Sequence, residues 1–188
     1  FSQYYTVIEG DITNCFGTIN HSVLMQQLKR RILDQRLLAL IWSMLKAGFI
    51  EDLQYFETQE GTPQGGIVSP LLANVYMHRL DEYMYKRFHD ITPEKRYQRR
   101  KKGELISVRY IRYADDFIVL MRDAERAAEL KKELADFISQ ELKMTLSEEK
   151  TRITNAEEGF DFLGVRTFIG PKRSNPLKVL PYQIPAEK

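Results

Sequence analysis

The sequence predicts an α+β domain in which helices pack on one face of a mostly antiparallel sheet. Strand-like and helix-like segments follow one another in the order strand, helices, long helix, two strands, helix, strands. The two central strand segments, residues 108–113 and 117–121, are joined by a very short connection, which indicates a tight turn and antiparallel pairing.

The N-terminal half is expected to contribute one strand and three helices. Either Asn20 or Ser22 is placed to cap the first helix. The Ser69-Pro70 pair predicts the start of the longest helix, because serine favours the N-cap and proline the first helical position. These elements are expected over residues 4–12, from about residue 23, over residues 34–46 and from residue 69 to about residue 88.

The C-terminal half is expected to continue from the central hairpin into a helix and a further strand or strand pair. Asp123 is placed to cap the helix, whose apolar stripe runs through Leu130, Leu134 and Ile138. The last strand or strand pair is expected within residues 160–169.

The composition is that of an ordinary globular domain. Of the 188 residues, 43% are hydrophobic and 29% are charged, and the formal net charge is +2. No run approaches the roughly 18–20 apolar residues of a membrane-spanning helix. A single cysteine, Cys15, precludes an internal disulfide and is typical of a reducing compartment. We therefore expect a cytoplasmic protein without a membrane partner.

Positive charge is concentrated in one part of the chain, which we call the basic segment. Such a cluster can neutralise phosphates and release their counterions, so it is a candidate RNA-binding element. A solvated, flexible loop explains it equally well. The basic segment comprises Lys95, Arg96, Arg99, Arg100, Lys101 and Lys102.

Three aspartates lie in or next to predicted strands, where aspartate is uncommon. Asp115 and Asp116 are adjacent between two apolar strands, and Asp11 ends the first strand. Carboxylates held close together repel one another unless a cation compensates them. Oxygen ligands suit Mg²⁺, and two such ions about 3.5–4 Å apart can hold the attacking and leaving oxygens of a phosphoryl displacement. The alternative is a solvated Asp-Asp turn.

Four motifs, in the order of the family, resemble those of reverse transcriptases. Tyr113-Ala114-Asp115-Asp116 resembles the signature hairpin, and residues 11–21 resemble the first catalytic motif. Residues 61–74, GTPQGGIVSPLLAN, closely resemble the nucleotide-site motif of the bacterial group II intron-encoded branch. Residues 160–164, FDFLG, resemble the primer grip. The resemblance implies a right-hand polymerase palm with partial fingers.

The resemblance also implies a domain organisation. Residues 1–180 would form the palm and part of the fingers, with a basic insertion at residues 91–104. Residues 181–188 would begin the linker to a helical thumb. The isolated chain is expected to polymerise poorly, since the remaining fingers and the thumb help to position the substrates.

The resemblance assigns a role to each matching residue. Asp11, Asp115 and Asp116 would be the catalytic ligands of two Mg²⁺ ions, with Mn²⁺ as an alternative metal and the carbonyl of Ile12 assisting. The expected nucleotide-binding residues are Asn14, Cys15, Phe16, Pro63, Gln64, Gly65 and Lys150. The expected primer-binding residues are Tyr113, Phe162, Leu163 and Gly164.

Two of these assignments have plain structural alternatives. Phe16 lies five positions after Asp11, where the family places an aromatic steric gate against the ribose 2′-hydroxyl, but a core phenylalanine fits the pattern too. Lys150 matches a lysine that approaches the triphosphate, but it can equally be a solvated lysine. Thr13-Asn14-Cys15 departs from the family, in which a lysine is usual.

The predicted function is RNA-directed DNA synthesis, with dNTPs, a DNA primer, an RNA template and group II intron RNA as partners. The full-length protein would add splicing (maturase) and retrohoming roles. Alternatives are a retron or diversity-generating reverse transcriptase, an RNA-directed RNA polymerase, a splicing cofactor without polymerase activity, and a basic α+β binding domain. Phe16 argues against the RNA polymerase, and the three aspartates argue against loss of catalysis.

Overall fold

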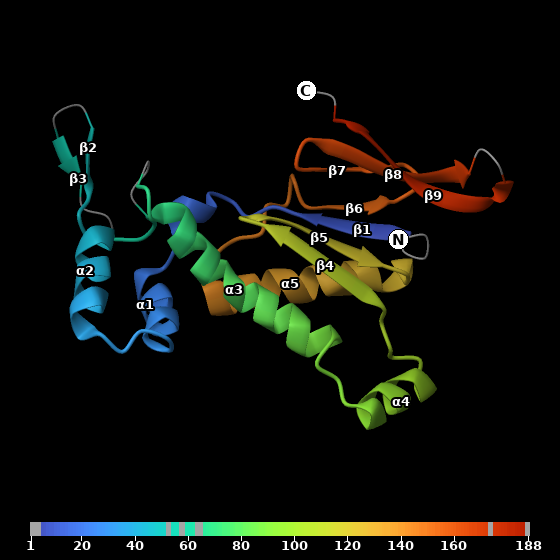
Figure 1. Cartoon of the computed structure of the whole chain (residues 1–188), viewed down its shortest axis with the longest axis horizontal. Coiled ribbons are helices and arrows are strands. Elements are labelled where there is room, and N and C mark those ends of the chain that lie inside the picture. The colour runs from blue at the N-terminus through green and yellow to red at the C-terminus, as the bar shows by residue number, and fades with distance from the viewer. Residues whose placement is uncertain (1–4, 52–53, 57–58, 63–65, 173–174, 187–188) are drawn as a thin grey trace. The chain divides into compact units, whose positions relative to one another are not determined.

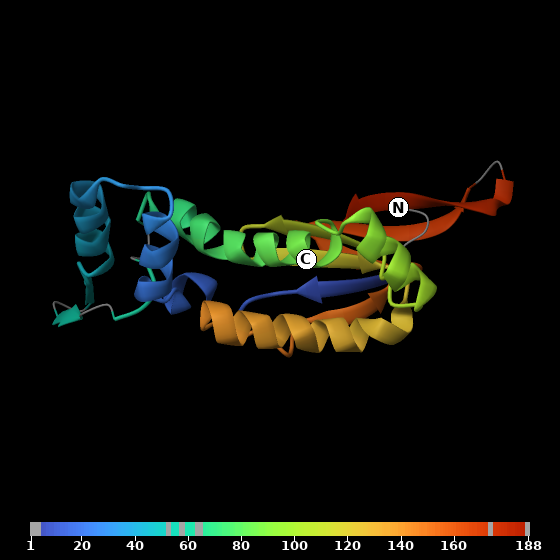
Figure 2. The same ribbon diagram turned by 90° about the horizontal axis from the view of Figure 1, so that it is seen from below.

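The centre of the fold is a four-stranded antiparallel sheet in the order β4-β5-β1-β6. A computed structural model describes residues 5–51, 54–56, 59–62, 66–172 and 175–186. Figures 1 and 2 show β1 between β5 and β6. The strands of this sheet are β1 (Thr6–Gly10), β4 (Val108–Tyr113), β5 (Asp116–Met121) and β6 (Arg152–Asn155).

The chain divides into two compact units. The first unit comprises Phe1–Asp11, Tyr83–Leu134 and Ser147–Lys188, and it contains the four-stranded sheet. The second unit comprises Ile12–Glu82 and Ala135–Leu146. Two long helices, α3 (Ser69–Phe88) and α5 (Ala127–Leu142), contribute residues to both units.

The hairpin of β4 and β5 is the predicted one. Tyr113 pairs with Asp116, which leaves Ala114 and Asp115 as a two-residue turn. Ala114 has a φ of 54°, the left-handed value that such hairpin turns need at their first central position. Left-handed backbone strains a residue that has a Cβ, and strain of this kind is concentrated at functional sites.

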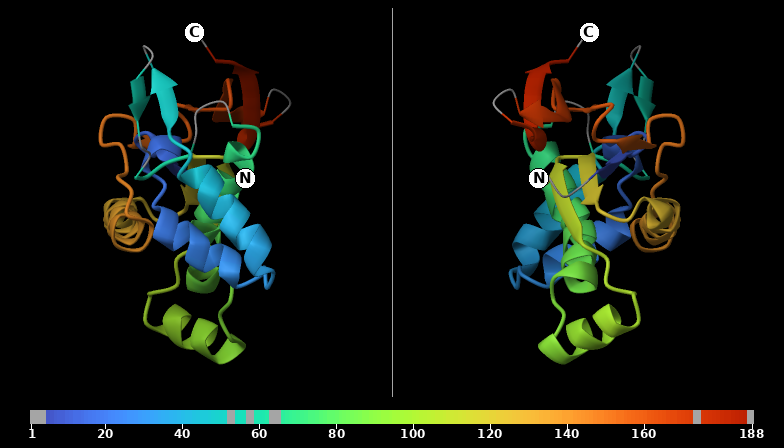
Figure 3. Two further views of the ribbon diagram at one scale, coloured as in Figure 1. Left: turned by 90° about the vertical axis from the view of Figure 1, so that its left-hand side faces the viewer. Right: turned by 90° about the vertical axis from the view of Figure 1, so that its right-hand side faces the viewer.

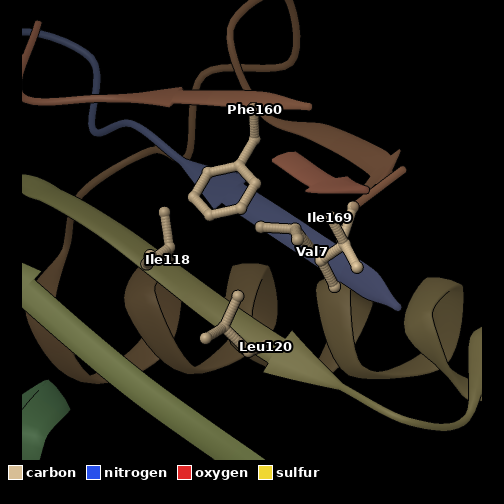
Figure 4. Close-up of a cluster of buried hydrophobic side chains, with 6 residues drawn as sticks. Val7, Ile118, Leu120, Phe160 and Ile169 are labelled. Atoms are coloured by element: carbon tan, nitrogen blue, oxygen red, sulfur yellow. The ribbon is translucent and has the colours of Figure 1, made fainter. Parts of the chain in front are cut away.

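One face of the sheet is covered by a second, smaller sheet. In Figure 4, the labelled side chains fill the space between β1, β5 and this smaller sheet, on the opposite side of β1 and β5 from α5. The buried cluster comprises Val7, Ile118, Leu120, Ala156, Phe160 and Ile169. The smaller sheet has the order β7-β8-β9, formed by β7 (Phe160–Phe162), β8 (Val165–Lys172) and β9 (Asn175–Pro185).

The other face of the four-stranded sheet is also buried, since Ile8, Val119 and Met121 are each fully buried. Side chains alternate along a strand, so these residues point away from the cluster of Figure 4. Leu130 and Leu134 on the apolar stripe of α5 are buried in the same unit. The expected α+β class, with an antiparallel sheet and helices on one face, is confirmed.

Several boundaries differ from the expected ones. Residues 181–185, expected at the start of a linker, belong to β9. The basic insertion contains a helix, α4 (Pro93–Lys101), which Thr92 caps by accepting from Lys95 N. Ser69 lies within α3 and does not precede it, because Leu72 N already donates to Val68 O.

Asp123 does not cap through its side chain. It precedes a short 3₁₀ helix, η2 (Ala124–Arg126), which runs into α5. Strand β6 was not expected.

In the second unit, two helices follow the short 3₁₀ helix η1 (Cys15–Thr18). Asn20 is the cap of α1 (His21–Lys29), since its side chain accepts from Val23 N at 3.1 Å. Asp34 caps α2 (Gln35–Leu45) in the same way. Figure 3 shows α1 beside α2. A small hairpin follows, formed by β2 (Phe49–Glu51) and β3 (Gln54–Phe56).

A buried tyrosine joins the parts of the second unit. Tyr76 on α3 donates its hydroxyl to the carbonyl of Leu142 at the end of α5 and accepts from Asn20 N at 3.3 Å. Burial raises the pKa of Tyr76 to about 12, so it stays a neutral donor. Within the described parts of the chain, no helix is long and apolar enough to span a bilayer.

Candidate active site

Two of the predicted aspartates line one hollow in the first unit, which we call the carboxylate hollow. Asp11 follows the last residue of β1, and Asp116 is the first residue of β5. The antiparallel register pairs Gly10 with Phe117, so the two aspartates lie next to this pair. The hollow has a volume of about 200 Å³, and Lys150 also lines it. The two ends of the central strands therefore present carboxylates to one space.

Asp115 occupies a different place in the same hairpin. It is the second residue of the two-residue turn, beside Asp116, and it does not line the hollow. Among the residues that the structure describes, no three acidic, histidine or cysteine side chains converge as a ready-made metal cluster. The structure thus brings Asp11 and Asp116 to one hollow and holds Asp115 at its margin.

The negative charges around Asp116 favour the binding of a cation. Partial burial raises the pKa of Asp116 above its usual value, and the carboxylates of Asp115 and Asp11 raise it further. The ammonium of Lys150 acts in the opposite direction, and its Nζ lies 3.5 Å from Oδ2 of Asp11. An all-oxygen donor set with excess negative charge fits a hard divalent cation such as Mg²⁺. Asp11, Asp115 and Asp116 are the residues that would hold it.

The ring of Phe117 lies over Gly10, where the two strands that carry Asp11 and Asp116 pair. A Cβ at this position would lie 2.6 Å from Cε1 of Phe117 and still nearer to two other atoms of the same ring. Contacts below 3.0 Å are essentially never made by real Cβ atoms. Phe117 is only 1% exposed, so its ring is enclosed. The absence of a side chain at Gly10 therefore leaves the space that the Phe117 ring occupies, next to the residues Asp11 and Asp116.

A glutamate, Glu9, links three strands beside the hollow. Its Oε1 accepts from the hydroxyl of Thr154 on β6 at 2.6 Å, and its Oε2 accepts from the backbone N–H of Asp161 on β7 at 3.4 Å. Glu9 and Asp161 both line the carboxylate hollow. This arrangement ties the hairpin of β7 and β8 to the strand that ends at Asp11.

The residues expected to bind the primer lie on two hairpins of the first unit. Leu163 and Gly164 form the turn between β7 and β8, with φ values of 53° and 75°. Two positive values are the pattern of a type I′ turn, in which leucine is unusual. Leu163 is half-exposed and, like Phe162, lines the carboxylate hollow. Tyr113 is 66% exposed at the end of β4.

In the second unit, the segment that follows Asp11 turns sharply. Asn14 adopts the left-handed conformation, with a φ of 47°, and η1 begins directly after it. Ile12 and Cys15 are buried, whereas Phe16 is only partly buried. Phe16 is therefore not among the buried core side chains, and its ring retains contact with solvent.

This turn is bound to the start of the nucleotide-site motif. Gly61 N donates to Ile19 O at 2.7 Å, and Thr62 N donates to Phe16 O at 2.8 Å. The ring of His21 lies 2.6 Å from Gly61 O, and because a carbonyl only accepts, Nε2 of His21 carries the hydrogen. The expected nucleotide contacts Pro63, Gln64 and Gly65 lie outside the described residues.

The basic segment forms most of α4 and lies in the first unit. None of the residues of α4 is buried. Arg99 donates to the carbonyl of Arg87 at 3.3 Å, which joins α4 to the end of α3. The rest of the basic segment is exposed, so these charges are available to a polyanion.

Comparison with known proteins identifies the family. Residues 2–167 match the family model described as "Reverse transcriptase (RNA-dependent DNA polymerase)". This chain belongs to the reverse transcriptase family. Protein YkfC of Escherichia coli is 34% identical over 97% of the chain and 51% of its own length. The group II intron-encoded protein LtrA of Lactococcus lactis is 36% identical over 91% of the chain and 36% of its own length.

The chain therefore spans about a third to a half of the length of these two relatives. Among solved structures, telomerase of Candida tropicalis in complex with a fragment of telomeric RNA has a TM-score of 0.65 and 14% identity. The similar region covers 87% of this chain and 28% of the telomerase chain. This similarity concerns the fold alone and agrees with the polymerase palm. The expected likeness to the group II intron-encoded branch is confirmed by the similarity to LtrA.

Sequence reasoning did not find Glu9, Gly10, Phe117 or Asp161. Glycine next to aspartate at a strand end was a weak signal for Gly10, since a glycine there marks a close approach. The link between Glu9 and Asp161 joins residues 152 positions apart and left no local pattern.

Proposed function

We propose that the chain is the palm of an RNA-directed DNA polymerase of the group II intron-encoded type, which joins dNTPs to a primer 3′-hydroxyl on an RNA template. The observation that carries this proposal is the carboxylate hollow, where Asp11 and Asp116 meet beside Lys150. The family membership supports the same reaction.

The proposed chemistry divides between the metals and the chain. Two Mg²⁺ ions, when bound, would activate the primer hydroxyl and stabilise the leaving pyrophosphate. Asp11, Asp115 and Asp116 would hold them, and the raised pKa of Asp116 is consistent with a place where a cation is needed. The carbonyl of Ile12 would assist.

The remaining residues would bind and orient the substrates. Lys150 is 71% exposed, so its ammonium can leave Asp11 and neutralise a triphosphate or supply a proton to pyrophosphate. The partly buried Phe16 would exclude a ribose 2′-hydroxyl. The strained, exposed turn at Leu163 and Gly164 would support the primer end next to the hollow.

The proposed polymerase function also specifies RNA partners. The exposed charges of α4 would bind phosphates of the template or of group II intron RNA. Splicing and retrohoming roles are proposed for the full-length protein, as is a cytoplasmic location in bacteria. A splicing cofactor without catalysis would use the same basic surface but would not need the carboxylates.

Asp115→Asn in the full-length protein tests the proposal. The change should abolish primer extension on an RNA template, because one charged metal ligand is lost, while the melting temperature stays near that of the wild type. Asp123→Asn is the matched control, since Asp123 is an exposed aspartate of the same unit that lies outside the hollow. Extension at the wild-type rate by Asp115→Asn would contradict the assignment and favour the cofactor.

A further inference from the structure

A second hollow, in the second unit, is lined by arginines. It lies between the end of α1 and one side of α3 and has a volume of about 350 Å³. We call it the arginine hollow. Its basic and amide lining comprises Gln27, Arg30, Arg31, Asn74, His78 and Arg79. Glu82 adds one carboxylate.

The protein compensates part of this positive charge. Arg79 is paired with Glu141 of α5, and His78 lies 3.3 Å from Asp81 and 4.0 Å from Glu82. Arg30 and Arg31 are exposed, and neither forms an ion pair with any residue in the described part of the chain. Carbonyls at the C-terminus of α1 favour a nearby cation, but each such interaction is worth only about 0.3–1 kcal/mol. The uncompensated positive charge of the hollow is therefore that of Arg30 and Arg31.

The backbone around the hollow is well defined. Arg31 N donates to Leu28 O at 3.0 Å, which holds the end of α1 in place. On α3, Asn74, His78 and Glu82 follow one another at intervals of four residues and so lie on one side of the helix. The two arginines thus face a regular helical surface.

The amide side chains of the hollow are oriented by backbone carbonyls. Gln27 donates from Nε2 to Tyr76 O at 3.3 Å, and Asn74 donates from Nδ2 to Pro70 O at 3.2 Å. Since the amide nitrogen of Gln27 faces the protein, its oxygen can accept a hydrogen bond from a ligand. A ligand that matches this hollow carries negative charge and a hydroxyl donor.

We propose that the arginine hollow binds the sugar–phosphate backbone of an RNA strand. The guanidinium groups of Arg30 and Arg31 match phosphate oxygens, and the amide oxygen of Gln27 can accept from a ribose 2′-hydroxyl. The site shares no residue with the carboxylate hollow. The inference rests on the proposed function only in taking RNA as the ligand.

The test uses the full-length protein with Arg30→Gln and Arg31→Gln combined. Binding of a single-stranded RNA oligonucleotide is measured by fluorescence anisotropy across a series of salt concentrations. Loss of two phosphate contacts on a single strand should weaken binding and lower the slope of log K against log salt by about 1.4. Arg30→Lys with Arg31→Lys should keep the slope and weaken binding less. Gln27→Leu should weaken binding of the RNA and leave binding of a DNA oligonucleotide of the same sequence unchanged, because only RNA carries the 2′-hydroxyl.

Arg36→Gln with Lys46→Gln is the matched control, because it removes two exposed positive charges from α2 and its C-cap in the same unit. An unchanged affinity and slope in the Arg30 and Arg31 variant would overturn the proposal. So would an equal loss in the control variant, or an equal effect of Gln27→Leu on RNA and DNA. None of these results would bear on polymerase function, which the Asp115→Asn variant tests separately.

Discussion

Gly10→Ala offers a sharp test of how the carboxylates proposed to be catalytic are positioned. Ordinary van der Waals contact of a Cβ begins at 3.4 Å, whereas an added Cβ would lie 2.6 Å from Cε1 of Phe117 and nearer to two other ring atoms. The ring or the strand must therefore move by about 1 Å. Because the ring is enclosed and Phe117 directly follows Asp116, the movement should displace that carboxylate relative to Asp11.

The expected size of the effect follows from these distances. Overpacking of this kind costs about 1–3 kcal/mol of unfolding free energy. A displacement of about 1 Å at a reacting centre can lower the rate by about a hundredfold. Gly10→Ala should therefore lose far more kcat than its stability loss explains, measured at a temperature where the variant is fully folded.

A double-mutant cycle checks the cause. Phe117→Leu removes the ring atoms that face Gly10, so Gly10→Ala combined with Phe117→Leu should recover much of the kcat that Gly10→Ala loses. Urea denaturation and single-turnover primer extension give the two free energies for each variant. Normal kcat in Gly10→Ala, or strictly additive losses in the double variant, would refute the claim that this contact sets the carboxylate spacing.

Two further predictions concern sugar selection and the primer end. Phe16→Val should raise incorporation of ribonucleotides relative to dNTPs, measured by single-nucleotide extension; unchanged selectivity with a large loss of stability would indicate a packing role instead. Glu9→Gln keeps an acceptor for Thr154 but places an amide against the N–H of Asp161, so the KM for primer–template should rise more than kcat falls. Thr154→Val, which loses only the first of these bonds, should change KM less, and equal effects of the two variants would contradict this account.

The sequence alone determined the type of fold and the family. Alternation of apolar residues around Asp115 and Asp116 predicted the central hairpin, and the structure has it with a two-residue turn. Local signals of this kind work because backbone propensity and side-chain periodicity act between residues that are close along the chain. For the same reason, the sequence predicted either Asn20 or Ser22 as the cap of the first helix, and the structure has Asn20.

Other elements were missed because the local sequence around them indicates a different structure. Strand β9 contains three prolines, at positions 176, 181 and 185, and a proline-containing end was expected to be a linker. Proline is tolerated at a sheet edge, which is where the order β7-β8-β9 places this strand. The 3₁₀ turn that precedes α5 likewise removed Asp123 from its expected capping role.

Tertiary structure alone decided how distant residues meet. Gly10 faces Phe117 because two strands more than a hundred residues apart pair in one register, and a shift of β5 by one residue would turn the Phe117 side chain to the other face. Glu9 reaches Asp161 because two sheets pack together, and Arg30 shares a hollow with Arg79 because the end of α1 lies near α3. The sequence determined which side chains can do chemistry. Strand register and helix packing decided which of them lie together, because contacts between distant residues produce no periodic pattern in the sequence.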